Sequence, residues 1–200
     1  VTYNISMSTQ KPETDTIAVN LDNTPFRNED GTLLFRPSGH GALIENLNDI
    51  DADIIFIKNI DNVCPERMRN DTILHKQLLA GLAIQTQEKI FSYLHAIDNG
   101  TANMDEIKQF ISENLGIKIS NTCNVREILN RPLRVCGIIK NTGEPGGGPF
   151  WVRSSDGTVS LQIIEPSQIA PENINILKNG EFFSPTDIVC MPRDINGNLF

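Results

Sequence analysis

The chain has 200 residues, of which 39% are hydrophobic and 21% are charged, and these shares are typical of a protein that folds around a sizeable core. Its 17 basic and 25 acidic residues give a formal net charge of −8. This charge argues against general binding of nucleic acid or of anionic lipid, because both need a basic surface. No apolar run approaches the length of a membrane span and no signal peptide opens the sequence, so we expect a cytoplasmic protein.

Four cysteines are scattered along the chain without a C-x-x-C pair: Cys64, Cys123, Cys136 and Cys190. This spacing favours reduced thiols over a disulfide framework, and it lacks the short ligand spacing of a zinc site. Both inferences agree with a cytoplasmic location.

The two ends of the sequence suggest a piece of a longer chain. The sequence opens at Val1 without a methionine, directly in an alternating run. It closes shortly after Asn196-Gly197, a strong hairpin signal with almost no strand behind it. We therefore expect a fragment of a larger domain.

The first third of the chain has the pattern of a strand–helix–strand unit. Residues 2–8 alternate like a half-buried strand, and a short strand is predicted at 16–19. A strand at 33–36, a helix at 42–47 and a continuous apolar strand at 53–58 follow. A continuous apolar strand is typical of a parallel sheet with both faces covered, so this order predicts a βαβ unit.

Helical spacing replaces this pattern in the middle of the chain. Apolar residues recur at three- and four-residue steps over 71–98, with Asp71 or Thr72 as the expected cap and Asn99-Gly100 as the end. Shorter helices are predicted at 104–114 and 124–130, and strands at 133–140, 150–153, 158–164 and 187–191. The predicted fold is one α/β domain over residues 1–200, with a mixed, mostly parallel sheet flanked by helices and a helical segment at about 71–130.

A glycine-rich turn lies between the second strand and the first helix, in Arg36-Pro-Ser-Gly-His-Gly-Ala-Leu43. Gly39 and Gly41 would let backbone amides approach a ligand closely, and His40 supplies a ring that can stack or donate. The alternative is a tight turn with an exposed histidine. The spacing is not that of a P-loop.

The loop Asn59-Ile-Asp-Asn62 directly follows the apolar strand. In an open parallel sheet, ligands gather at the carboxyl ends of strands, where Asp61 would be able to hold Mg²⁺ against phosphate oxygens. The alternative is an Asx-turn that only satisfies its own backbone.

Two later segments also have a chemical interpretation. Glu165 ends the strand at 158–164 and would accept hydrogen bonds from a sugar hydroxyl, or simply lie in solvent. The loop Gly143-Glu-Pro-Gly-Gly-Gly-Pro149 has the composition of a hinged lid, of a phosphate-binding nest or of a plain connector.

Several of these motifs together resemble known families. The segments 10–16, 35–43 and 143–149 resemble domain of unknown function 4301, an uncharacterised bacterial family, along nearly the whole chain. A second resemblance rests on four short motifs that follow one another in the chain: Gln10 after the opening strand, the turn at 37–41, the strand end at 59–62 and the late strand end at 163–168. In this order they resemble motifs of the nucleotide-sugar pyrophosphorylases, and most closely of their UDP-N-acetylhexosamine group. This second resemblance implies a nucleotide-diphospho-sugar transferase-like fold.

The resemblance to the pyrophosphorylases implies roles for individual residues. Gln10 would contact the uracil edge, Gly39 and Gly41 would pack against the nucleoside, and His40 and Asn62 would lie beside the nucleotide. Asp61 would hold Mg²⁺ near the α-phosphate. Gly137 and Glu165 would bind the sugar, as would an asparagine at 175 or 179. Catalytic residues are not assigned, because the Gly-rich loop and late lysine of those enzymes have no counterpart in this sequence.

The implied function is that of a sugar-1-phosphate nucleotidyltransferase, with a nucleotide or nucleotide sugar and Mg²⁺ as partners and with little activity expected of the fragment. Two alternatives stay open. One is a non-catalytic module that binds a nucleotide or phosphosugar, and the other is a domain without a small-molecule ligand.

Overall fold

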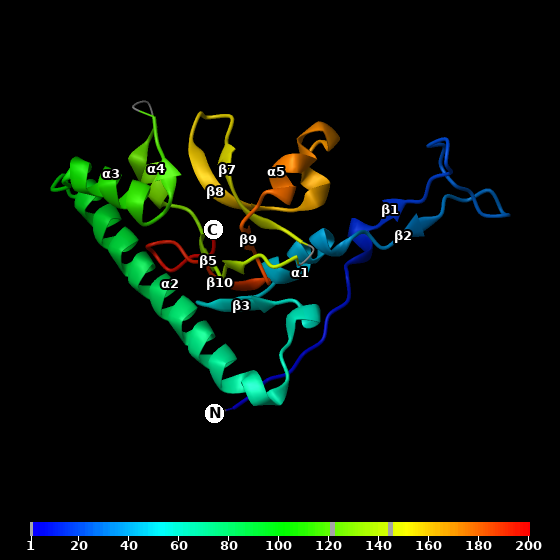
Figure 1. Ribbon diagram of the computed structural model, residues 1–200, viewed down its shortest axis with the longest axis horizontal. Helices are drawn as coiled ribbons and strands as arrows, with labels where there is room; N and C mark the ends of the chain where they lie inside the picture. Colours follow the sequence, from blue (N-terminus) through cyan, green and yellow to red (C-terminus); the bar gives the residue numbers. More distant parts are fainter. Residues whose placement is uncertain (1, 121–122, 144–145) are drawn as a thin grey trace. The chain divides into compact units, whose positions relative to one another are not determined.

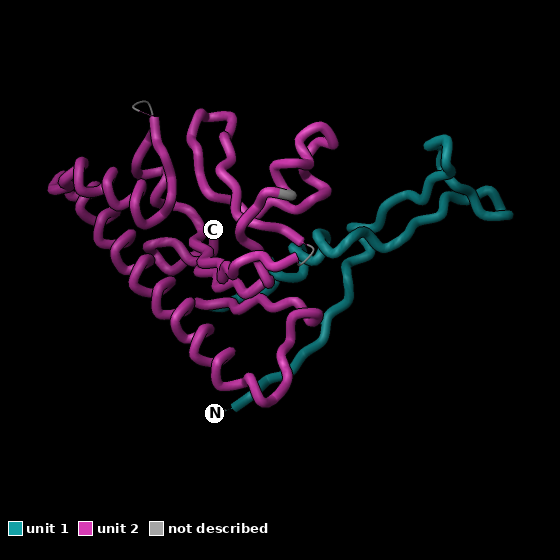
Figure 2. The backbone as a smooth tube through the Cα atoms, in the orientation of Figure 1, with its two compact units in different colours: residues 1–52 teal, residues 53–200 magenta. Residues whose placement is uncertain are grey.

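The computed structural model describes residues 2–120, 123–143 and 146–200 (Figure 1). The chain forms two compact units, residues 1–52 and residues 53–200 (Figure 2). Two compact units can belong to one domain, so the single domain with a helical insertion at 71–130 stays a prediction.

Unit 1 contains little regular structure. Its elements are η1 (Pro12–Thr14), β1 (Thr16–Ile17), β2 (Phe35–Arg36), η2 (His40–Leu43) and α1 (Ile44–Asn48). The strands β1 and β2 pair antiparallel, and the predicted helix at 42–47 is confirmed by α1 and the turn before it. The prediction of a half-buried strand at 2–8 is wrong, since residues 2–8 form no strand and their apolar side chains are exposed.

One five-residue turn recurs four times in the chain, at 20–24, 28–32, 154–158 and 194–198. In each turn the first N–H donates to the fifth carbonyl at 2.8–2.9 Å, and the fourth N–H donates to the first carbonyl at 2.9–3.0 Å. The fourth residue has a positive φ of 65–84°, which explains why glycine or asparagine stands there. In the first three turns an aspartate at the third position accepts from the N–H and the hydroxyl of the threonine that closes the turn.

The helices predicted for the middle of the chain are confirmed. They are α2 (Arg69–Asp98, 30 residues), α3 (Met104–Glu113) and α4 (Val125–Leu129). Side chains of Asn103 and Asn124 accept hydrogen bonds from the first free N–H groups of α3 and α4. Gly100, at φ 70°, allows the chain to leave α2. Helix α2 begins two residues before the predicted cap at Asp71.

The strands of unit 2 form three small sheets in which all described pairs are antiparallel. One has the order β3 (Ile55–Lys58), β10 (Asp187–Met191), β5 (Leu133–Cys136). Another has the order β4 (Ile117–Lys118), β8 (Val159–Ile164), β7 (Gly148–Arg153), and β6 (Ile139–Lys140) pairs with β9 (Phe182–Phe183). A short helix, α5 (Ile174–Lys178), precedes β9.

This topology overturns the predicted fold class. The sheets are not mostly parallel, and the transferase-like parallel sheet implied by the resemblance is absent from the described residues. The strands on either side of α1 belong to different sheets, so they form no βαβ unit. The apolar strand β3 is an edge strand that pairs only with β10, and its Phe56 is 49% exposed. An apolar run identifies a strand, but it contains no information on the direction or the distance of the partner strand.

The core of unit 2 is built around α2. Toward its C-terminal end, Leu94 packs with residues of α3 and α4, among them Ile107, Ile111 and Leu129. In its middle, Ala83 packs on Val189 and Met191 of β10. Helix α2 therefore joins the small helices to the sheet β3–β10–β5 (Figure 1).

We expect Leu94→Ala to lower the free energy of unfolding by about 2–5 kcal/mol, because the lost side chain leaves a cavity in this core. Leu94 is 0% exposed, whereas Leu78 on the same helix is 61% exposed. Leu78→Ala, the matched control, should change stability by about 0.5 kcal/mol or less. Urea unfolding followed by circular dichroism measures both, and equal effects would contradict the packing of α2.

Candidate anion-binding site

Two lysines and one aspartate meet at one end of the sheet β3–β10–β5. Lys58 Nζ lies 2.5 Å from Asp187 Oδ2, and Lys76 Nζ lies 3.0 Å from Asp187 Oδ1. The three side chains are 21–30% exposed, so they are largely shielded but still reached by solvent. We call these residues the lysine–aspartate cluster.

The fold places each member of the cluster through regular structure. Lys58 ends β3 and stands directly opposite Asp187, the first residue of β10. Strand alternation puts Asp187 on the same face as Val189 and Met191, the face that packs on α2. Lys76, in the second turn of α2, therefore reaches the same carboxylate.

The backbone around Asp187 is constrained on both sides. Thr186 has a φ of 55°, a conformation that a β-branched residue rarely adopts and that costs free energy. The N–H of Gly137 donates to the Asp187 carbonyl at 2.7 Å, and a Cβ at Gly137 would lie 3.3 Å from the Asp187 Cβ. This close contact therefore favours glycine at position 137, because any larger residue would crowd Asp187.

The cluster carries one more positive than negative charge. Partial burial by itself raises the pKa of Asp187, but the hydrogen bonds and charges of Lys58 and Lys76 outweigh it and hold the pKa below its ordinary value. Asp187 is therefore a carboxylate at neutral pH, facing two ammonium groups. Lys76 Nζ also lies 5.8 Å from the centre of the Phe56 ring.

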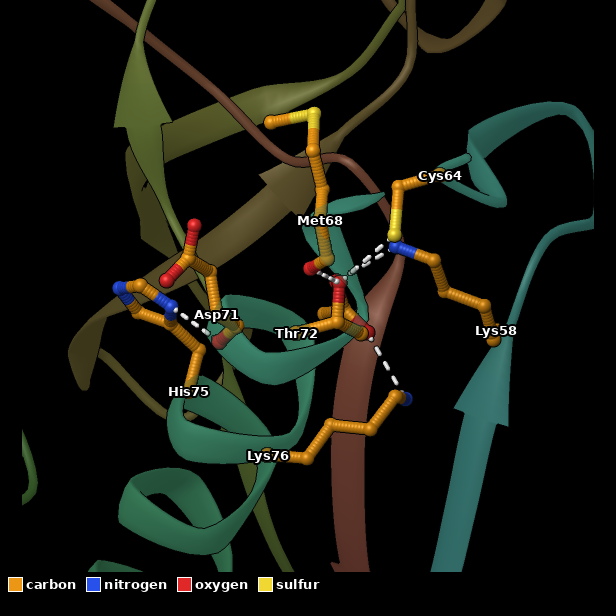
Figure 3. A network of polar contacts seen from close by, with 8 residues as sticks. Lys58, Cys64, Met68, Asp71, Thr72, His75 and Lys76 are labelled. Atoms are coloured by element: carbon orange, nitrogen blue, oxygen red, sulfur yellow. Dashed lines mark hydrogen bonds and ion pairs between the residues drawn. The ribbon is translucent and has the colours of Figure 1, made fainter. Parts of the chain in front are cut away.

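Further polar contacts fix the first turns of α2 beside the cluster (Figure 3). Cys64 Sγ contacts Thr72 Oγ1 at 2.8 Å, and this hydroxyl also donates to the Met68 carbonyl at 3.3 Å. His75 Nδ1 donates to the Asp71 carbonyl at 2.7 Å. The contact between Cys64 and Thr72 ties the segment between β3 and α2 to the helix, one turn before Lys76.

The predicted phosphate loop directly follows Lys58. Asp61 and Asn62 lie in the turn η3 (Ile60–Asn62), where the Asn59 side chain accepts from the Asp61 N–H at 3.5 Å and donates to Asp61 Oδ2 at 3.3 Å. This is a variant of the Asx-turn alternative, with Asn59 as the bonding side chain. Asp61 is exposed, and in the described part of the chain no three His, Cys, Asp or Glu side chains are placed to hold a metal ion.

The residues predicted to bind the sugar lie in different parts of unit 2. Gly137 is joined to the lysine–aspartate cluster by its bond to Asp187. Glu165 is exposed at the end of β8, where its N–H donates to Gln168 Oε1 at 2.8 Å. Asn175 and Asn179 belong to the turn formed by α5 and its C-terminal cap. Whether these residues bind a sugar stays a prediction.

The remaining predicted residues lie in unit 1, and the structure brings them together there. The Gln10 amide donates to the Ser38 carbonyl at 2.9 Å and accepts from the Ser38 N–H at 2.7 Å. Ser38 directly precedes Gly39, His40 and Gly41. A Cβ at Gly39 or Gly41 would meet nothing within 4 Å, so packing inside the protein does not explain these glycines. Their nucleotide-binding role, together with that of Gln10, His40 and Asn62, stays a prediction.

The glycine-rich segment 143–149 is tightly packed from Gly146 on, whereas a Cβ at Gly143 would meet nothing within 4 Å. Residues 144 and 145 lie outside the described residues. A Cβ at Gly146 would lie 2.7 Å from the Phe183 ring, and one at Gly147 would lie 2.7 Å from Glu165 Oε1. At Gly148 it would lie 2.5 Å from the Phe182 carbonyl oxygen. Close packing therefore accounts for these three glycines, while a role of the segment as a lid, a phosphate-binding nest or a connector stays a prediction.

Sequence reasoning missed all three members of the lysine–aspartate cluster. The ion pairs join residues that are 129 and 111 positions apart, and neither spacing forms a motif. The only local signal was a lysine at the end of an apolar strand, beside a loop already interpreted as phosphate-binding.

The fold and the cluster define an acidic α/β protein with small antiparallel sheets and a half-buried cationic site. No described helix is long and apolar enough to cross a membrane. The chain matches the family described as Domain of unknown function (DUF4301) over residues 1–200, and it belongs to this family. Comparisons with curated proteins and with solved structures found no significant match.

The lowered pKa of Asp187 predicts a pH-dependent contribution to stability. The two ion pairs stabilise the folded state above about pH 4, the ordinary pKa of an aspartate, and this contribution is lost as the pH falls through the lower folded-state pKa. We expect Asp187→Asn to cost about 1–2 kcal/mol at neutral pH and progressively less in acid. Urea unfolding at several pH values measures the difference, with Glu88→Gln on the exposed side of α2 as control. A cost that is the same at pH 7 and in acid would rule out the ion pairs as its source.

Glycine-to-alanine substitutions at Gly148 and at Gly81, both in unit 2, should have opposite effects on stability, because only Gly148 is closely packed. Gly148→Ala should lower the free energy of unfolding by about 1–3 kcal/mol, because the new methyl group meets a backbone oxygen that cannot move freely. Gly81→Ala, in the middle of α2 and with nothing within 4 Å, should raise it by up to about 1 kcal/mol. Denaturant unfolding distinguishes the two, and a neutral Gly148→Ala would show that the segment is loose.

Proposed function

We propose that this protein binds a small phosphate-bearing molecule, of the phosphosugar or nucleotide class, at the lysine–aspartate cluster. The observation that carries the proposal is the surplus positive charge: two half-buried ammonium groups share a single carboxylate in a chain of net charge −8. A compact local cation on an acidic protein favours one small anion over a polyanion such as nucleic acid.

The chemistry of the two lysines suits phosphate. Each ammonium group has three N–H donors, and one contact to Asp187 leaves others for a ligand oxygen. Lysine is a common phosphate-binding residue that acts as a point charge. Because both side chains keep partial exposure, an incoming phosphate can approach them without displacing the core.

The surrounding segments support the same ligand class. Lys58 directly precedes the loop with Asp61 and Asn62, and Gly137 contacts Asp187. These residues were assigned to nucleotide, metal and sugar by the resemblance to the pyrophosphorylases, on motifs that did not include either lysine. The charge of the two lysines and the motif resemblance are independent arguments, and both point to the same end of β3. Together they support a phosphate ligand there.

Nucleotidyl transfer has less support than binding. The resemblance implies it together with a parallel sheet, and the observed sheets are antiparallel. For Mg²⁺, Asp61 provides one exposed carboxylate, which is enough only where ligand phosphates complete the coordination. Mg²⁺ would then neutralise phosphate charge, and binding through the lysines does not depend on it.

Isothermal titration calorimetry of the whole chain tests the proposal with inorganic phosphate, a hexose 1-phosphate, UTP and a UDP-sugar, each with and without Mg²⁺. We expect binding that weakens with added salt and a loss of about tenfold or more in affinity for Lys76→Gln, because one charged hydrogen bond is removed. Lys58 still pairs with Asp187 in this variant, so the fold should be retained.

Lys108→Gln, which removes an exposed lysine of α3, is the matched control and should bind like the wild type. If Lys76→Gln and Lys108→Gln lost the same affinity, the loss would come from the change in net charge alone, and the proposed site would be refuted. If none of the four ligands binds, the cluster has a structural role and the alternative of a domain without a small-molecule ligand gains support. Pyrophosphate release from UTP and a hexose 1-phosphate would establish nucleotidyl transfer.

A further inference from the structure

A separate cavity of about 530 Å³ lies in unit 2, along the free edge of β5 and opposite β8. Helices α2 and α4 and the segment after α3 also line it, and part of the cavity is open to solvent. This volume falls in the range of small-molecule sites in proteins. None of the three members of the lysine–aspartate cluster lines the cavity, so it is a second place in which a ligand can be held.

Apolar and polar side chains contribute to the lining of the cavity in nearly equal measure. Aliphatic side chains come from α2, α4, β5 and β8, and they include Ile90, Leu129, Val135, Leu161 and Ile163. Polar side chains, among them Thr86, Ser160 and Gln162, line the rest of the cavity. A ligand with an aliphatic part and a polar end therefore matches this lining.

All the charged residues that line the cavity are basic. They are Arg131 and Arg134, and no aspartate or glutamate is among the lining residues although the chain has 25 of them. Among the described residues, Arg134 has no carboxylate partner in an ion pair. An anionic ligand therefore matches the site.

Arg134 is held in place by neighbours on β8. Its Nη2 donates to Gln162 Oε1, and Gln162 Nε2 donates to Ser160 Oγ at 2.9 Å. The remaining N–H groups of this guanidinium keep the planar arrangement that binds both oxygens of a carboxylate. Beside it, burial raises the pKa of the Cys136 thiol, which is thus a neutral part of the wall.

We propose that this cavity binds a small aliphatic carboxylic acid, with the carboxylate on Arg134 and the hydrocarbon chain against the walls formed by α2, α4 and β8. The site is independent of phosphate binding at the lysine–aspartate cluster, because the two sites share no residue.

Calorimetric titration with straight-chain carboxylates from butanoate to decanoate, and with the alcohols of equal length, tests both halves of the proposal. Each added methylene should tighten binding about fourfold until the cavity is full, and longer chains should gain nothing more. The carboxylates should bind more tightly than the alcohols, because only they pair with the guanidinium.

Arg134→Gln should weaken the carboxylates about tenfold and leave the alcohols unchanged. Arg153→Gln is the matched control, since Arg153 is an exposed residue of β7 outside the cavity lining. In Leu82→Trp, a larger side chain at an exposed lining position should shorten the preferred chain, and an exposed substitution spares the fold. Lys76→Gln should have no effect on this series.

Three results would overturn the proposal. One is the absence of binding by every member of the series, and another is affinity that does not depend on chain length. The third is an equal loss for Arg134→Gln and Arg153→Gln, which would show that Arg134 contributes only its share of the overall charge.

Discussion

The antiparallel pairing of β10 with both β3 and β5 is the constraint on which unit 2 depends. Among the described residues, the two outer strands of this sheet pair only with β10. Val189 and Met191 of β10 pack against Ala83 of α2. Toward its C-terminal end, the same helix α2 packs against α3 and α4. A strand of five residues near the end of the chain thus organises elements that begin more than a hundred residues earlier.

The local elements of this fold could be predicted from the sequence, whereas their partners could not. Periodicity located α2 and α3 to within a few residues, because a helix buries a stripe whose spacing is visible locally. The apolar run of β3 was correctly recognised as a strand, but continuous hydrophobicity was wrongly interpreted as parallel pairing with both faces covered. Phe56 shows the error physically: an edge strand can present a large apolar side chain to solvent, where Lys76 covers part of its ring.

The same distinction applies to the candidate sites. Motif reasoning selected Gln10 and the 39–41 turn, which the structure does bring together through Ser38, since these residues are close in sequence or joined by one short sheet. It did not find Lys58, Lys76 and Asp187, whose proximity arises only when β3, β10 and α2 are assembled. Nor did it find Arg134 and Gln162, which stand on strands of two different sheets. Charge counts over a whole chain conceal such local excesses of positive charge.

The pairing register of β10 with β3 and β5 determines the position of the charged side chains in both cationic sites. Opposite β10, Val135 stands across from Val189 on the face that packs on α2, while Arg134 stands across from Cys190 on the other face. A slip of one residue would bury the guanidinium against α2 and expose the valine, and the loss of apolar burial makes that register unfavourable. The same alternation puts Asp187 on the α2 face, within reach of Lys76. The buried Val189 and Met191 therefore determine where the charges lie. Substitutions at these two positions should disturb both sites, although neither residue belongs to the lysine–aspartate cluster or lines the cavity.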